Sequence, residues 1–140
     1  MAERTEAPSL NSFGVGFLPG LIGIRLAKAE RGLAVAELEV RKELLAPNGY
    51  LHAGTVVTLA DTACGVGCLH SLPEGASGFT TIELKANFLG TAVEGRLDCR
   101  AIAEHLGKAT QLWDAVVVRR ETGKTIALFR CTQMILRPKP

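Results

Sequence analysis

One apolar stretch of the chain, residues 53–69, contains a single charged side chain, Asp61. Its sequence is AGTVVTLADTACGVGCL, and we expect it to form a buried helix of about 17 residues. Gly65 and Gly67 lower its helix propensity, but they permit a close approach to a sheet. A carboxylate alone in apolar surroundings costs free energy unless it is paired, protonated or used in chemistry. Asp61 is therefore the first candidate for a functional residue.

Most of the remaining chain alternates between apolar and polar residues, which is typical of strands with one covered face. We expect strands over residues 21–29, 33–42, 79–89, 97–105, 110–120 and 125–136. On the third of these strands, one face should carry the polar side chains, namely Thr81, Glu83, Lys85 and Asn87. Residues 12–21 are rich in glycine and proline and predict a short helix or turn.

The order of elements is two strands, a long helix and four strands. One apolar helix is buried most economically by an antiparallel sheet of about six strands that wraps around it. The sequence therefore predicts an α+β fold in one domain over residues 1–140, with a flexible tail over residues 1–12. The outer face and the edge strands of such a sheet stay uncovered, which favours pairing with another copy of the chain.

Composition argues against several classes of function. The chain has 140 residues, of which 47% are hydrophobic and 21% charged, and a net charge of +2 with no run of basic residues. Such a weak and scattered positive charge does not indicate nucleic-acid binding. Residues 1–12 lack the charged start and apolar core of a signal peptide, and no apolar run is long enough to span a membrane. We therefore expect a cytoplasmic protein that binds neither nucleic acid nor membrane.

The four cysteines form no CxxC pair, and no histidine lies at zinc-ligand spacing from Cys64, Cys68, Cys99 or Cys131. Cys64 and Cys68 are four residues apart, so they lie on one face of the expected helix. We expect all four to be small packing residues that are kept reduced in the cytoplasm, with no metal site. Redox or metal use is the alternative.

The motif GYLHAG over residues 49–54, followed by LAD over residues 59–61, resembles that of the hotdog-fold thioesterases. The similarity is to the type from phenylacetic acid degradation (PaaI-like), and with the order of elements it covers nearly all of residues 13–137. Its specific part is H-x-G with an acid seven positions after the glycine. Members of this family usually read G-x-x-H-G-G, so Ala53 stands here where glycine is usual.

The resemblance implies hydrolysis of acyl-CoA or aryl-CoA thioesters at a site between two subunits, in a homodimer or homotetramer. It assigns Asp61 as nucleophile or general base. It assigns the backbone N–H at the helix start, at Ala53 with Gly54, as donor to the oxyanion, and Thr81 as an assisting residue. It implies no cofactor, because CoA is part of the substrate.

Two polar residues before the helix have open roles. Relatives often place an Asn or Gln six positions before the histidine, which is Ala46 here, whereas the nearby amide is Asn48. Asn48 is therefore either a substitute contact to the thioester oxygen or only the first residue of a turn. His52 is either catalytic, because histidine titrates near neutral pH, or it holds its loop through hydrogen bonds, which we favour.

The turn over residues 105–108 offers backbone N–H groups and a cation, which suits phosphate binding. The resemblance implies CoA contacts nearby, so the candidate CoA-binding residues are Gly107, Lys108, Asn87 and Phe88. A solvated turn is the alternative for residues 105–108.

The first N–H groups of a helix lack intrahelical partners and suit an oxygen that gains negative charge. Ala53 and Asp61 are eight residues apart, which is about 12 Å along a helix. A nucleophile or base and an oxyanion donor must both lie within about 3 Å of one reacting carbon. The two groups of one chain therefore cannot serve one site, and the sequence predicts a site shared between subunits.

Two other functions fit the same residues. A hotdog hydratase or dehydratase would pair His52 with Asp61 across the interface, and a non-catalytic module would bind acyl-CoA without releasing thiol. Release of free CoA thiol separates hydrolysis from both. The sequence leaves open the identity of the acyl group and the choice between dimer and tetramer.

Overall fold

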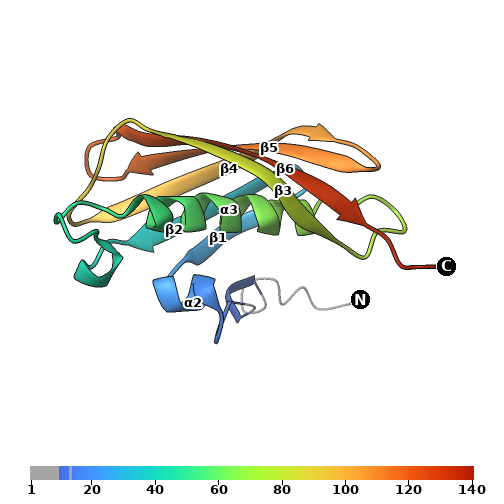
Figure 1. Cartoon of the computed structure of the whole chain (residues 1–140), viewed down its shortest axis with the longest axis horizontal. Coiled ribbons are helices and arrows are strands. Elements are labelled where there is room, and N and C mark those ends of the chain that lie inside the picture. The colour runs from blue at the N-terminus through green and yellow to red at the C-terminus, as the bar shows by residue number, and fades with distance from the viewer. Residues whose placement is uncertain (1–9, 13) are drawn as a thin grey trace.

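One long helix, α3 (Ala53–Leu69), lies against one face of a six-stranded antiparallel sheet (Figure 1). The computed structural model describes residues 10–12 and 14–140. The strands follow the order β1-β2-β4-β5-β6-β3 across the sheet, so β1 and β3 are its edges. Their bounds are β1 (Arg25–Glu30), β2 (Leu33–Glu39), β3 (Gly78–Phe88), β4 (Arg96–Leu106), β5 (Thr110–Arg119) and β6 (Thr125–Leu136). The predicted α+β fold class is confirmed.

The sheet curves around α3, which contacts all six strands (Figure 1). The predicted alternation of β2 is confirmed, because Ala34, Ala36 and Leu38 are buried. Small residues also face the helix from the other central strands, namely Ala101, Ala115 and Ala127. Gly67 of α3 lies so close to β5 that a Cβ atom there would be 2.5 Å from Cη2 of Trp113. Trp113 is fully buried and therefore belongs to the core.

The N-terminal segment differs from the prediction of a strand over residues 21–29. The short helix α2 (Leu18–Ile22) takes the first of these residues, with a proline in its first turn. Gly23 ends this helix with a φ of 94°, a conformation that favours glycine. β1 therefore begins only at Arg25. The predicted tail over residues 1–12 lies mostly outside the described residues.

The connection from β2 to α3 also starts earlier than predicted. The strand expected over residues 33–42 ends at Glu39, and a short 3-10 helix, η1 (Lys42–Leu44), follows. Between them, the guanidinium group of Arg41 donates to the carbonyl of Leu21 at 2.8 Å and to that of Ile22 at 2.6 Å. Arg41 therefore ties the end of α2 to the segment that leads into α3.

The four cysteines lie in the hydrophobic core. All four thiols are free and buried, as expected for packing residues. Burial raises the pKa of Cys68 and of Cys99 to about 12, so both stay protonated.

None of the helices in the described part of the chain is long and apolar enough to span a bilayer. The cytoplasmic location stays a prediction.

β3 contains a bulge that the alternating sequence pattern does not reveal. Thr81 pairs with Gln133 of β6, and two residues further along β3, Glu83 pairs with Thr132. Ile82 is therefore an extra residue, which reverses the alternation of faces beyond it. Thr81 lies on the inner face, because its partner Gln133 is fully buried. The prediction that Thr81 shares the polar face of Glu83 is wrong.

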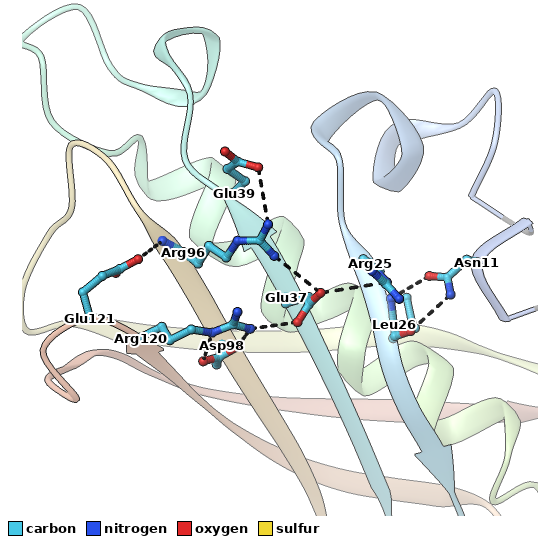
Figure 2. A network of polar contacts seen from close by, with 9 residues as sticks. All are labelled: Asn11, Arg25, Leu26, Glu37, Glu39, Arg96, Asp98, Arg120 and Glu121. Carbon is cyan, nitrogen blue, oxygen red and sulfur yellow. Dashed lines mark hydrogen bonds and ion pairs between the residues drawn. The ribbon is translucent and has the colours of Figure 1, made fainter. Parts of the chain in front are cut away.

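Charged side chains on the outer face join β1, β2 and β4 (Figure 2). Glu37 lies at the centre, with its carboxylate 3.9 Å from Nε of Arg25, 3.9 Å from Nη1 of Arg96 and 2.8 Å from Nη2 of Arg120. Arg120 also donates to both carboxylate oxygens of Asp98, and this hydrogen bonding lowers the pKa of Asp98. The acidic side chains of this network therefore form ion pairs on the surface. Each such pair contributes little to stability.

Gly67→Ala should destabilise the fold, because the new methyl group would meet the buried indole of Trp113 at 2.5 Å. Overpacking costs about 1–3 kcal/mol, against a gain of about 1 kcal/mol in helix propensity. Gly65→Ala is the matched control, since it gains the same propensity and meets only the half-buried Phe79, whose Cζ lies 3.0 Å away. Urea unfolding should give Gly67→Ala the lower free energy of unfolding. Equal stabilities would contradict the close packing.

Candidate active site

A tight turn leads the chain into α3. Asn48 Oδ1 accepts from the backbone N–H of Tyr50 at 3.1 Å, and the N–H of Ala46 donates to the carbonyl of Tyr50 at 2.7 Å. Gly49 has a φ of 88°, which explains the glycine at this position. Asn48 is thus engaged as the turn residue. Its role as a substitute for the amide absent at Ala46 stays a prediction.

His52 caps the first turn of α3. Its ring nitrogen Nδ1 accepts from the backbone N–H of Gly54 at 2.8 Å, and its carbonyl accepts from the N–H of Thr55 at 3.0 Å. In this arrangement the neutral ring carries its proton on Nε2. The structure therefore shows a hydrogen bond that holds this loop, as predicted for His52. The same bond occupies the N–H of Gly54, which has no second proton for a substrate oxygen.

The backbone N–H of Ala53 is the free donor at the helix start. No backbone or side-chain group within residues 10–12 and 14–140 accepts a hydrogen bond from it, and Ala53 is exposed. The positive end of the helix dipole lies here, and such N–H groups suit an anionic oxygen. Ala53 is therefore available for the predicted role of oxyanion donor.

Asp61 lies in the middle of α3, and its Oδ1 atom is buried without a hydrogen-bond partner among the described residues. Burial raises the pKa of its carboxyl group, and the neighbouring Thr81 hydroxyl acts in the opposite direction. Burial is the larger of the two effects. The Thr81 hydroxyl also donates to Gln133 Oε1 at 2.6 Å. A half-buried acid with a raised pKa and an unpartnered oxygen is a candidate functional group.

The structure does not bring Asp61 and Ala53 of one chain together. Both lie on α3, eight residues and about 12 Å apart along its axis. Thr81, by contrast, lies near Asp61, since its hydroxyl affects the pKa of that acid. A site that uses both Asp61 and the N–H of Ala53 needs a second copy of the chain.

The candidate CoA-binding residues fall into two pairs at opposite ends of β3. Gly107 and Lys108 lie in the β4–β5 turn, where the N–H of Gly107 is already bonded within the turn. The carbonyl of Lys108 accepts from Arg137, which follows β6, so this turn lies near the start of β3. Asn87 and Phe88 are the exposed last residues of β3, about 30 Å away along the strand. In the described part of the chain, no group of three or more His, Cys, Asp or Glu side chains is placed to hold a metal ion.

Residues 48–126 match the sequence profile of the thioesterase superfamily. The chain belongs to this family. It is 38% identical over 111 residues to a 1,4-dihydroxy-2-naphthoyl-CoA hydrolase from Listeria monocytogenes, covering 79% of this chain and 89% of that protein. It is 33% identical over 110 residues to the acyl-coenzyme A thioesterase PaaI from Escherichia coli, covering 78% of this chain and 75% of that protein.

Solved structures confirm the hotdog fold of this thioesterase. A mutant thioesterase from Pseudomonas aeruginosa superposes with a TM-score of 0.88 at 26% identity, covering 96% of both chains. The PaaI protein from Escherichia coli superposes with a TM-score of 0.77 at 28% identity, covering 84% of this chain and 83% of that chain. The predicted PaaI-like hotdog thioesterase is thus confirmed as to family, fold and thioester hydrolysis. The catalytic residues and the shared site stay predictions.

Two buried glutamines of this thioesterase, Gln111 and Gln133, are not predicted from the sequence. They pair directly across β5 and β6, and both are fully buried. Gln111 Nε2 donates to the carbonyl of Ser71 at 2.9 Å, and its Oε1 accepts from Trp113 Nε1 at 2.8 Å. Gln133 instead accepts from Thr81. Both glutamines stand at inward positions of strands whose other inward residues are apolar. This pattern in the sequence could have revealed them.

His52→Ala should lower the free energy of unfolding by about 1 kcal/mol, because the N–H of Gly54 loses its cap. His52→Asn supplies a side-chain oxygen that can accept the same hydrogen bond. It should therefore restore most of the stability and most of the turnover of CoA thioesters. Urea unfolding and thiol release measure the two properties. A stable but inactive His52→Asn variant would instead assign His52 to acid–base catalysis.

Proposed function

We propose that this thioesterase hydrolyses an acyl-CoA to the free carboxylate and CoA in a site shared by two copies of the chain. Asp61 of one copy is the nucleophile or general base, and the N–H of Ala53 in the other copy stabilises the oxyanion. The proposal rests on two groups of α3 that have no hydrogen-bond partner among the described residues. They are the buried Oδ1 atom of Asp61 and the backbone N–H of Ala53. CoA is part of the substrate, and this chemistry needs no further cofactor.

The free edge of β3 is suited to pairing with a second copy. β3 is an edge strand of 11 residues, and its apolar side chains Ile82, Leu84 and Phe88 are exposed by 52%, 44% and 46%. A long apolar edge is a template for strand pairing. Two-fold pairing of identical edge strands is antiparallel and joins the two sheets. We therefore assign the interface to β3.

The packing of α3 on β3 fixes which residues of the two elements lie side by side. The helix and the strand run in opposite directions (Figure 1). Gly65 lies opposite Phe79, because a Cβ atom at Gly65 would be 3.0 Å from Phe79 Cζ. Four helical residues span about 6 Å, and two strand residues span about 6.8 Å. Asp61 therefore lies opposite Thr81.

The same arithmetic predicts the register of the dimer. Ala53 lies about 12 Å further back along α3 than Asp61, which places it opposite about Lys85 once the bulge is counted. A two-fold axis near Glu83 places Thr81 of one strand beside Lys85 of the other. It therefore brings Ala53 of one copy level with Asp61 of the other, as the chemistry requires.

This pairing also unites the two pairs of candidate CoA-binding residues. The start of β3 in one copy meets the end of β3 in the other. Lys108 of one copy then lies at the same end of the dimer as Asn87 and Phe88 of the other. Lys108 and Arg137 would supply positive charge there for the phosphates of CoA.

The chemistry follows from the two groups on α3. The thioester oxygen accepts from the N–H of Ala53, which stabilises the negative charge that develops on this oxygen. Asp61 either attacks the carbonyl carbon to give a mixed anhydride that water opens, or removes a proton from an attacking water. In both routes the C–S bond breaks and CoA leaves as the thiol. The raised pKa of Asp61 makes its carboxylate the stronger base.

We propose an aromatic acyl group for the substrate. The name of the Listeria relative, a 1,4-dihydroxy-2-naphthoyl-CoA hydrolase, supports this class. The PaaI protein, which comes from the phenylacetic acid degradation operon, supports it as well. Benzoyl-CoA and phenylacetyl-CoA are therefore the first substrates to assay, beside medium-chain acyl-CoAs.

Ala53→Pro should remove most of the turnover without unfolding the protein. Proline lacks the N–H but is well tolerated at the first position of a helix, and His52 already has the extended conformation that precedes proline. Loss of one oxyanion donor costs about 100-fold or more in kcat, and Asp61→Asn should cost at least as much. Ala53→Gly keeps the N–H and should retain turnover, as should Asp98→Asn on the outer face.

Detection of free CoA thiol measures these variants on the aromatic and medium-chain substrates. We expect the wild-type protein to release thiol from the aromatic substrates. Near wild-type turnover by Asp61→Asn would remove Asp61 from the mechanism. An enoyl absorbance change without thiol release would indicate hydration in place of hydrolysis.

A further inference from the structure

The fully buried amide of Gln133 lies beside the proposed site and has no role in the chemistry above. Its Oε1 accepts from the Thr81 hydroxyl at 2.6 Å, whereas its Nε2 has, among the described residues, only a weak contact with Cys131 Sγ at 3.5 Å. Burying an amide costs free energy unless its hydrogen bonds are made. The bond to Thr81 is therefore the interaction that explains a glutamine at this position.

Gln133, Thr81 and Asp61 form a row from β6 across β3 to α3. The bulge at Ile82 turns Thr81 to the inner face, beside Gln133. The contact between Gly65 and the ring of Phe79 sets Asp61 opposite Thr81. Thr81 is close enough to Asp61 to affect the pKa of its carboxyl group. The Thr81 hydroxyl therefore lies between the amide of Gln133 and the carboxyl group of Asp61.

The protons of this row determine what it can do. A hydroxyl has one proton to donate and two lone pairs that accept. The Thr81 proton goes to Gln133, so Thr81 has no proton left for Asp61. Asp61 Oδ1 indeed has no donor among the described residues. The lone pairs of Thr81 Oγ1 can then accept from a water molecule.

We propose that Gln133 is a positioning residue that fixes the direction of the Thr81 hydroxyl. By accepting the Thr81 proton, it keeps a hydrogen-bond donor away from Asp61 and makes Thr81 an acceptor. A water that donates one proton to Asp61 and the other to Thr81 Oγ1 presents its lone pair to the thioester carbon. The water oxygen then bonds to that carbon, its proton passes to Asp61, the C–S bond breaks and Asp61 returns the proton to the CoA thiolate. This inference rests on the proposed function and selects its general-base route.

The ionisable groups on the elements around Asp61, among the described residues, are neutral thiols or face away from it. Cys64 of α3 interacts electrostatically with Asp61, and its hydrogen bond to Cys131 of β6 together with burial raises the pKa of Cys64, which stays neutral. On β3, Glu83 and Lys85 pair with outward residues of β6 and face away. Asp114 of β5 forms an ion pair on that same outer face.

Gln133→Met is the direct test, because methionine has a similar volume and accepts only weakly. In the substrate-free protein, NMR titration should show a lower pKa for the Asp61 carboxyl group than in wild type, since the released Thr81 proton now donates to the carboxylate. With an acyl-CoA that the wild type hydrolyses, kcat should fall about 10- to 100-fold. The acid limb of the pH profile of kcat/KM should move to lower pH, in the same direction as the pKa of the Asp61 carboxyl group.

Gln111→Met is the matched control. Gln111 is equally buried and lies directly across from Gln133, but it bonds to Ser71 and Trp113. Its loss should lower stability without moving the pKa of Asp61 or the acid limb. Thr81→Val is a second, independent variant. It removes both the acceptor for the water and the hydroxyl that lowers the pKa of Asp61, so kcat should fall while the pKa of Asp61 does not fall.

An unchanged or raised pKa of Asp61 in Gln133→Met would overturn the proposal. A rise would mean that the amide donates to Thr81, with Thr81 donating to Asp61. Wild-type kcat in Thr81→Val would overturn it as well, because Thr81 would then hold no water. The titration needs no turnover, so it is independent of the proposed function, which fails instead if the wild-type protein releases no thiol from any acyl-CoA.

Discussion

The fixed rise of an α-helix is the constraint on which the rest of this structure depends. Ala53 and Asp61 share α3, so about 12 Å separates them along its axis whatever the loops do. A reaction that needs both groups at one carbon therefore requires two helices. The proposed pairing of β3 edges supplies the second helix in the opposite direction, with the free N–H of one copy level with the acid of the other.

Core packing, and not polar contact, sets the geometry around this helix. Small inward residues of the central strands let α3 approach the sheet, and Gly67 lies directly against the indole of Trp113. Gly65 against the ring of Phe79 fixes the level of the helix relative to the edge strand. The bulge in β3 then turns Thr81 inward, toward the acid. The placement of Thr81 beside Asp61 is therefore an outcome of how closely one helix packs on its own sheet.

The sequence could predict α3 and β6 to the residue, because one is a continuous apolar run between turn residues and the other a regular alternation. It could also identify Asp61 as a candidate functional residue, since a lone charge in such a run is costly. It could not predict that Thr81 faces inward, because an extra residue in β3 shows only when the strand is paired. Gln133 stayed hidden for a related reason, since its partner Thr81 lies 52 positions away in the chain.

Co-expression of Ala53→Pro and Asp61→Asn chains tests the shared site most directly. Each variant alone is defective at every site, whereas a mixed dimer has one site in which both groups are intact. Random association makes half of the dimers mixed, so the purified mixture should show about a quarter of wild-type turnover per chain. Turnover no higher than the mean of the two separate variants would contradict a site shared between two copies.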